Sequence, residues 1–269
     1  MKSKLPAFPY LVFMAVFILV PLLLVAYYGF TDKQGTFTLE FFRKFLEPLY
    51  LKVFARSIWL ALVSTLLCLV IGYPLAMILA GDTFKKKNIL IVLFIVPMWM
   101  NFLVRTYAWL TLLENNGLIN SFLDFLHLPK LELLYNNRAV VMGMVYNFLP
   151  FMVLPIHSVL VKIDRSLIEA AEDLGADRLR VFSRVTLPLS VPGVLSGITM
   201  VFMPSITTFV ISRLLGGGKT TLVGDVIEQQ FLTVYNWNFG AAISLFMMAV
   251  ILLSMALLSR IDRGKEGLL

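Results

Sequence analysis

Residues 164–188 read DRSLIEAAEDLGADRLRVFSRVTLP, a charged stretch in an otherwise strongly apolar chain. It lies between two apolar runs that are each long enough to cross a lipid bilayer as a helix. Hydrophobic and charged residues alternate at helical spacing, which predicts two short amphipathic helices. The chain is therefore expected to leave the membrane, form a helical hairpin and enter the membrane again.

Local signals set the expected ends of these two helices. Ser166 and Glu169 have the spacing of a capping box, so the first helix is expected to begin at Ser166. Gly175 can adopt the left-handed conformation that ends a helix, and the second helix is expected to end before Pro188. Three acidic residues are expected in the first turns, where the helix dipole favours them: Glu169, Glu172 and Asp173. Three arginines follow in the second helix: Arg178, Arg180 and Arg184.

The composition places the rest of the chain in a membrane. Of 269 residues, 59% are hydrophobic and 14% are charged, and the mean hydropathy is +0.86. Because one helical span needs roughly 20 apolar residues, we expect an all-α integral membrane protein with six transmembrane helices. The expected spans are 8–30, 57–80, 89–113, 139–161, 189–213 and 240–259. The first is too long for a signal peptide and is expected to be retained.

The basic residues fit a membrane topology better than nucleic-acid binding. The formal net charge is +7, but lysines and arginines are scattered over helix ends and short loops, so no nucleic-acid partner is expected. With both termini in the cytoplasm, more basic residues lie inside than outside, although the outer loops are longer. Anionic membrane lipids would meet the positive charge. The inner set includes Lys2, Lys4, Lys85, Lys86 and Lys87.

The sequence offers no pattern of an enzyme active site. Cys68 is the only cysteine, so neither an internal disulfide nor a Cys-based metal site can form. His127 and His157 lack a metal-binding pattern, and no metal or cofactor is expected. The run at 216–220, GGGKT, resembles the end of a phosphate-binding loop, but Arg213 stands where the first glycine is required. ATP is therefore expected to bind to another subunit.

The stretch 164–188 resembles the EAA motif of permease subunits in binding-protein-dependent ABC importers. Glu169-Ala170-Ala171 is followed after three residues by Gly175, and later by Val185-x-Leu187-Pro188, with valine where the family usually has isoleucine. The resemblance implies a type I ABC importer permease fold and a coupling helix that rests in a groove of a cytoplasmic ATPase. The residues implied in ATPase coupling are Glu169, Ala170, Ala171, Asp173, Gly175, Leu187 and Pro188.

Further segments resemble the B-type permease of spermidine/putrescine importers. They include Pro97-x-Trp99-x-Asn101, then Arg105 and Tyr107, and also Tyr146 followed by LPFM at 149–152. Aromatic faces can bind a polyamine cation. A buried arginine, however, would repel one and suits an anionic substrate or a structural role. The candidate residues of the translocation path are Trp99, Asn101, Arg105, Tyr107 and Tyr146.

The resemblance implies a complete importer in the bacterial inner membrane. Its other members would be a homologous second permease, two ATPase subunits and an extracytoplasmic substrate-binding protein. Within this chain we expect a first helix with its outer loop at 1–56, a five-helix core at 57–260 and a cytoplasmic tail at 261–269. Two alternatives remain: the same architecture importing another solute, such as iron or a small organic ion, and a secondary transporter acting alone. The lack of acidic or histidine residues deep in the spans argues against proton coupling.

Two finer patterns concern helix packing. Gly193 and Gly197 form a small-xxx-small pair that suits close contact between helices. Two outer stretches have an apolar helical face, and each is expected either to pack on the bundle or to form a docking rim for the binding protein. The first face consists of Leu118, Ile119, Phe122, Phe125 and Leu126. The second consists of Val223, Val226, Ile227, Gln230, Phe231 and Val234.

Overall fold

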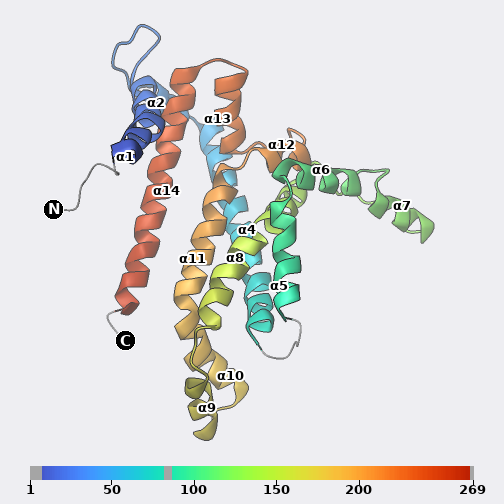
Figure 1. Cartoon of the computed structure of the whole chain (residues 1–269). Helices are drawn as coiled ribbons and strands as arrows, with labels where there is room; N and C mark the ends of the chain where they lie inside the picture. Colours follow the sequence, from blue (N-terminus) through green and yellow to red (C-terminus); the bar gives the residue numbers. More distant parts are fainter. Residues whose placement is uncertain (1–7, 82–86, 267–269) are drawn as a thin grey trace, which may run out of the picture.

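A computed structural model describes residues 8–81 and 87–266 of the chain, and these residues form an almost entirely helical bundle (Figure 1). Lys2, Lys4, Lys85 and Lys86, which contribute to the expected orientation, lie outside the described residues. The first half contains α1 (Phe8–Met14), η2 (Ala15–Leu19), α2 (Val20–Phe30), α3 (Glu40–Phe45), α4 (Pro48–Ala80), α5 (Lys87–Ile95), η3 (Val96–Trp99), α6 (Phe102–Leu113) and α7 (Leu118–Phe125). The second half contains α8 (Asn137–Leu160), α9 (Arg165–Asp173), α10 (Arg178–Val181), η4 (Phe182–Thr186), α11 (Leu187–Thr207), α12 (Val210–Gly216), α13 (Val223–Leu232) and α14 (Trp237–Glu266).

Five of the expected spans correspond to long apolar helices, and the sixth corresponds to a broken pair. In the described residues the long helical spans are Val12–Phe30, Pro48–Ala80, Asn137–Leu160, Arg178–Thr207 and Trp237–Leu257. The broken pair joins Ile89–Trp99 to Phe102–Phe125 at an angle of 94°. The all-α membrane fold is therefore confirmed, with five or six crossings according to how the bent pair is counted.

The span expected at 89–113 is broken near Pro97 in the structure. The helix tightens into the 3₁₀ turn η3 around Pro97, and Met100 then takes an extended conformation with ψ 146°. Asn101 begins a new helix, because its side-chain oxygen accepts a hydrogen bond from the Leu103 N–H at 2.8 Å. Pro97 has no backbone N–H to donate, and Asn101 is a strong N-cap. Together they turn the chain, although the apolar sequence continues through the turn.

The expected ends of the fifth span also need correction. The helix does not stop before Pro188 but runs without a break through Arg178–Thr207. Its η4 segment is a π-helical turn, in which the Leu187 N–H bonds to the Phe182 carbonyl five residues back. This wider turn makes room for the proline ring, which would clash in a regular helix. At the other end the span stops at Thr207, so that Arg213 lies on the separate helix α12.

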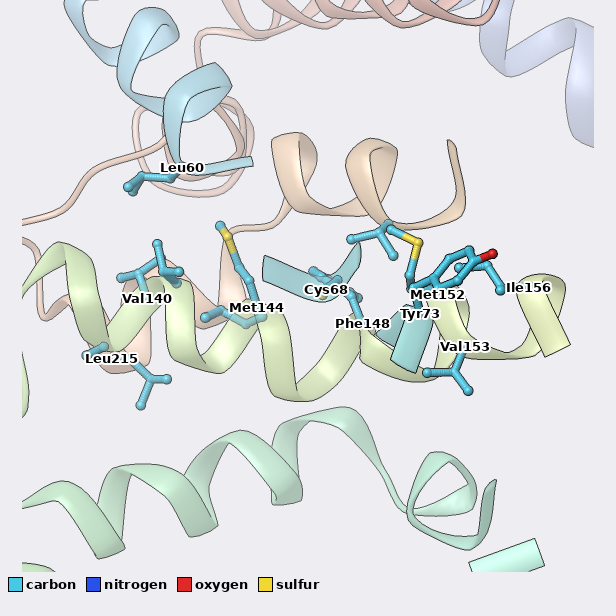
Figure 2. Close-up of a cluster of buried hydrophobic side chains, with 14 of the residues drawn as sticks. Leu60, Cys68, Tyr73, Val140, Met144, Phe148, Met152, Val153, Ile156 and Leu215 are labelled. Carbon is cyan, nitrogen blue, oxygen red and sulfur yellow. The ribbon is translucent and has the colours of Figure 1, made fainter. Parts of the chain in front are cut away.

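The core consists of α4, α8 and α11, which contact one another. Figure 2 shows buried side chains of α4 and α8 in this core, together with Leu215 of α12. Gly193 and Gly197 bring α11 close to α8, as the sequence predicts. A Cβ atom added at Gly193 would lie 2.9 Å from the Pro155 carbonyl oxygen, and one at Gly197 would lie 2.7 Å from the Met152 sulfur. A hydrogen bond of 2.7 Å between Tyr73 and Ser190 joins α4 to α11 at the same level. Cys68 is fully buried among these helices.

A second, smaller cluster lies where α14 meets α3, α4, α11 and α13. Phe45, Tyr50 and Phe239 pack there, with ring centroids 5.0 Å apart for Tyr50 and Phe239 and 6.4 Å apart for Phe45 and Tyr50. Figure 1 shows α2 and α14 side by side at the edge of the bundle, away from α8. The first span is thus attached to the last span and not to the three-helix core.

Candidate coupling loop and translocation path

The predicted helical hairpin is present, but the cap of its first helix lies two residues earlier than expected. Helix α9 is capped by Asp164, whose carboxylate accepts a hydrogen bond from the Ser166 N–H at 3.0 Å. This bond holds the pKa of Asp164 below its usual value. Aspartate and serine stabilise a helix N-terminus to a similar degree. Capping by Asp164 is favoured because the helix then starts earlier and contains more hydrogen-bonded residues.

The other end of α9 follows the sequence prediction. Gly175 has φ +78°, and its N–H bonds to the Glu172 carbonyl at 2.9 Å. The Ala176 N–H bonds to the Ala171 carbonyl at 3.0 Å. These two bonds form a Schellman motif, which requires a left-handed residue after the helix. Gly175 is therefore the residue that turns the chain from α9 into α10.

The charges of α9 differ from the expectation. Because the helix begins at Arg165, its first turn holds no acidic residue, and Glu172 and Asp173 lie in its last turn. The helix dipole is negative at that end and opposes their charge. The prediction that the dipole stabilises these carboxylates is wrong, and the last turn instead presents concentrated negative charge to its surroundings.

The hairpin protrudes from the end of the bundle that lies opposite α7, α12 and α13 (Figure 1). Helix α9 has no buried residue, and both Glu169 and Ala170 are exposed. Two large apolar side chains beside the turn are also open, with Leu174 89% and Leu179 75% exposed. Leu187 and Pro188 belong to the long helix above the hairpin and are exposed as well. The predicted coupling residues thus lie on one accessible end of the molecule.

The five candidate path residues lie on three elements: η3, α6 with its cap, and α8. Trp99 and Tyr107 lie on either side of the α5–α6 bend and are 82% and 53% exposed. Asn101 is engaged as the cap of α6. Tyr146 on α8 meets Trp109 of α6 edge-on, with ring centroids 5.2 Å apart. Trp109 is therefore the aromatic partner of Tyr146 in this chain.

Arg105 is the most unusual of the path candidates. The side chain is only 8% exposed, and its Nε atom has no hydrogen-bond partner among the described residues. Asn147 on α8 is 1% exposed and donates to the Gly143 carbonyl at 2.9 Å, but its Oδ1 atom is also without a partner there. Buried polar groups without partners are unfavourable and often mark function. Sequence reasoning missed Asn147, whose only signal is an amide within an apolar run.

The end of the bundle opposite the hairpin carries charged groups on α12 and α13. Arg213 of α12 forms a salt bridge with Glu228 of α13. Asp225 accepts a hydrogen bond from the Leu222 N–H at 2.8 Å, yet burial raises its pKa to about 6. Val223 and Val226 are buried, so α13 packs on the bundle. Helix α7 instead leaves its apolar face open, and three of its side chains are more than half exposed: Leu118, Phe122 and Phe125.

The bundle with its exposed helical hairpin defines an integral-membrane component of a transport system. Residues 72–267 match the family of binding-protein-dependent transport system inner membrane components, and the chain belongs to this family.

Among its relatives is the spermidine/putrescine transport system permease protein PotB of Escherichia coli. The two are 38% identical over 258 residues, which cover 93% of this chain and 94% of PotB. The PotB protein of Haemophilus influenzae is 38% identical over 247 residues, covering 88% and 85% of the two chains. The Escherichia coli inner membrane ABC transporter permease protein YdcU is 28% identical over 261 residues, covering 90% and 83%.

Solved structures confirm the fold. A chain of a bacterial ABC transporter involved in the import of the acidic polysaccharide alginate has a TM-score of 0.82 and 17% identity, covering 95% of this chain and 92% of that one. A chain of the MetNI methionine ABC transporter in an inward-facing conformation has a TM-score of 0.58 and 16% identity, covering 81% and 98%. The protein therefore has an ABC importer permease fold and belongs to the inner membrane.

Proposed function

We propose that this chain is the permease subunit of an ATP-driven polyamine importer and forms half of its translocation path. The observation that carries the proposal is the 38% identity to PotB spermidine/putrescine permeases across 93% of the chain. The complete importer would contain a second, homologous permease, two cytoplasmic ATPase subunits and an extracytoplasmic binding protein. Both termini of this chain would lie in the cytoplasm, and ATP would be bound and hydrolysed by the ATPase subunits.

Helix α9 supplies the surface that an ATPase subunit would engage. The carboxylates of its last turn lie at the negative end of the helix dipole and are repelled by it. A groove with positive charge in the partner would offset this repulsion. The small side chain of Ala170 lets a partner protein approach the backbone of the exposed helix closely. Leu174 and Leu179 offer apolar contacts beside it. These features support a docked helix with a charged anchor and an apolar rim.

One observation favours a second candidate, an importer of the same architecture for an anion. Arg105 is a buried cation in the bent span, and it suits an anionic solute better than a polyamine. A probable sulfate transport system permease protein of Helicosporidium is 27% identical over 207 residues, covering 76% of each chain. The polyamine proposal is preferred because the identity to PotB is higher and extends over more of the chain.

Uptake by cells separates these proposals. We expect deletion of this chain to abolish the uptake of radiolabelled spermidine and putrescine and to leave sulfate uptake unchanged. Uptake should return with the wild-type chain and should require intracellular ATP. Unchanged spermidine uptake in the deleted strain would reject the polyamine proposal. Transport that follows an ion gradient, with no ATPase copurifying, would show a secondary transporter instead.

A further inference from the structure

A cavity of about 510 Å³ lies where the first span ends and the last span begins. Helix α2 ends at Phe30, the chain then forms a tight hairpin, and α14 begins beside it at Trp237 (Figure 1). Four aromatic side chains and two of opposite charge line the cavity: Tyr27, Tyr28, Tyr235, Trp237, Asp32 and Lys33. The volume is within the range of small-molecule sites.

The walls of this cavity are held by several contacts. The Asn238 amide donates to the Thr31 carbonyl at 2.7 Å and to the Tyr28 carbonyl at 3.1 Å, which ties the end of α2 to α14. The rings of Tyr28 and Trp237 have centroids 6.1 Å apart, and Trp237 meets Phe231 edge-on at 5.7 Å. The aromatic wall is therefore built by buried hydrogen bonds and ring packing.

The acidic side of the cavity is equally well defined. The carboxylate of Asp32 accepts hydrogen bonds from the N–H groups of Gln34 and Thr36, at 2.8 and 2.9 Å, and from the Thr36 hydroxyl at 2.6 Å. These bonds keep the pKa of Asp32 below its usual value, so the group is negative at neutral pH. An aromatic wall beside a fixed carboxylate is the arrangement that binds an organic ammonium group.

Lys33 adds the opposite charge at the same cavity, and this decides between two kinds of ligand. A free polyamine carries only positive charge and would be repelled by the lysine. A headgroup with an ammonium and a phosphate would satisfy both side chains, since lysine is a common phosphate ligand. Pairing of Asp32 and Lys33 with one ligand therefore favours a zwitterion.

The position of the cavity points to a lipid as the source of that zwitterion. The span Val12–Phe30 has a hydropathy of 2.4, and only 6% of it is buried within the subunit, so acyl chains can lie along it. Tyr27 and Tyr28 lie in the last turn of this span, and the end of a span is where headgroups are expected and where tyrosine and tryptophan are enriched. We propose that this cavity binds the headgroup of phosphatidylethanolamine, with the ammonium between the aromatic rings and Asp32 and the phosphate at Lys33.

Native mass spectrometry of the complete importer tests the proposal. The complex would be taken from bilayers that contain equal amounts of phosphatidylethanolamine and phosphatidylglycerol with the same acyl chains. We expect phosphatidylethanolamine to be retained about fivefold over phosphatidylglycerol, the effect of one cation–π contact. Trp237→Leu should abolish that preference, whereas Lys33→Gln should lower the retention of both lipids, because both carry the phosphate. Matched controls are Trp59→Leu on the exposed face of α4, which should keep the preference, and Lys130→Gln in an outer loop, which should keep the retention of both lipids.

The outcomes separate the sources of the ligand. Equal retention of the two lipids, unchanged preference in Trp237→Leu, or unchanged retention in Lys33→Gln would each overturn the proposal. Lys33→Gln changes an exposed side chain and is expected to leave the melting temperature unchanged, so that a folding defect cannot explain its effect. Displacement of the lipid by millimolar spermidine would also overturn it, because the cavity would then be a site for the free polyamine.

Discussion

Gly175 provides the sharpest test of the coupling loop, because its requirement for glycine is purely conformational in the isolated subunit. Its φ is +78°, and a Cβ atom added there would meet nothing within 4 Å. Gly175→Ala therefore introduces no clash and adds only the strain of a left-handed residue, about 1 to 2 kcal/mol. That energy shifts the balance between the capped turn and opened conformations by about 5- to 30-fold.

The assay is the ratio of spermidine imported to ATP hydrolysed by the complete importer in proteoliposomes. We expect Gly175→Ala to lower this ratio by up to about 30-fold, while ATP hydrolysis continues. Gly175→Asn should recover most of the loss, because asparagine enters the left-handed region more easily. Gly218 is a matched control at the opposite end of the molecule, since its φ is also +78° and the space around it is also open.

Three results would refute this reasoning. A wild-type ratio in Gly175→Ala would show that the turn does not limit coupling. An equal loss in Gly218→Ala would show that the effect is general strain. An equal loss in Gly175→Asn would show that the ATPase groove excludes any side chain, so that space and not backbone conformation explains the glycine.

Three further predictions concern the rest of the chain. Gly193→Ala should destabilise the purified complex by about 1 to 3 kcal/mol through overpacking against the Pro155 carbonyl, and an unchanged melting temperature would contradict the α8–α11 contact. For Asp225, the pKa of about 6 exceeds the ordinary 3.8, so stability should fall as pH rises from about 4 to about 6; Asp225→Asn should flatten the melting temperature over that range, and a slope equal to wild type would refute the assignment. Arg105→Gln should reduce uptake without lowering the melting temperature, and a fall in melting temperature as large as that of Gly193→Ala would indicate a structural role.

Features that depend on residue type at one position could be predicted from the sequence. The turn at Gly175 and the close contact at Gly193 and Gly197 follow from the absence of a side chain, whatever surrounds them. The membrane bundle follows from apolar length alone. The family resemblance of the loop at 164–188 combined several such positions, and it therefore identified the class of protein correctly.

The broken third span could not be predicted in the same way. Hydropathy measures how apolar a segment is and gives no information on whether its helix is straight or bent. Proline alone is a poor guide, since Pro74 and Pro150 lie inside continuous helices. At Pro97 the outcome is decided by the cap at Asn101, which competes with a helix that could have continued. The cap of α9 shows the same limit: Asp164 and Ser166 are residue types of similar cap strength, and the capping-box spacing favoured Ser166.

The two outer amphipathic helices show a limit of another kind. Both α7 and α13 have an apolar face in the sequence, but α13 buries Val223 and Val226 while α7 leaves Phe122 and Phe125 in the open. The helical spacing of apolar residues identifies an apolar face, but it does not show which element packs against that face. The difference arises because α13 is folded back against α14, whereas α7 follows the bend of α6 away from the core.

The continuity of Arg178–Thr207 gives the proposed coupling loop a direct mechanical route to the core. A displacement of α9 reaches this helix across the Gly175 turn, and the helix has no break before Thr207. Along it, Ser190 is bonded to Tyr73 of α4, and Gly193 and Gly197 are seated against α8. Both glycines lie against the backbone of α8, so movement of α11 is expected to be passed to α8, and through the Tyr73–Ser190 hydrogen bond to α4. The π-helical turn at Phe182–Thr186 lies between the hairpin and these contacts and is a point where the helix can bend. ATPase closure acting on α9 would therefore tilt α4, α8 and α11 together about their base, and would not slide one helix along another.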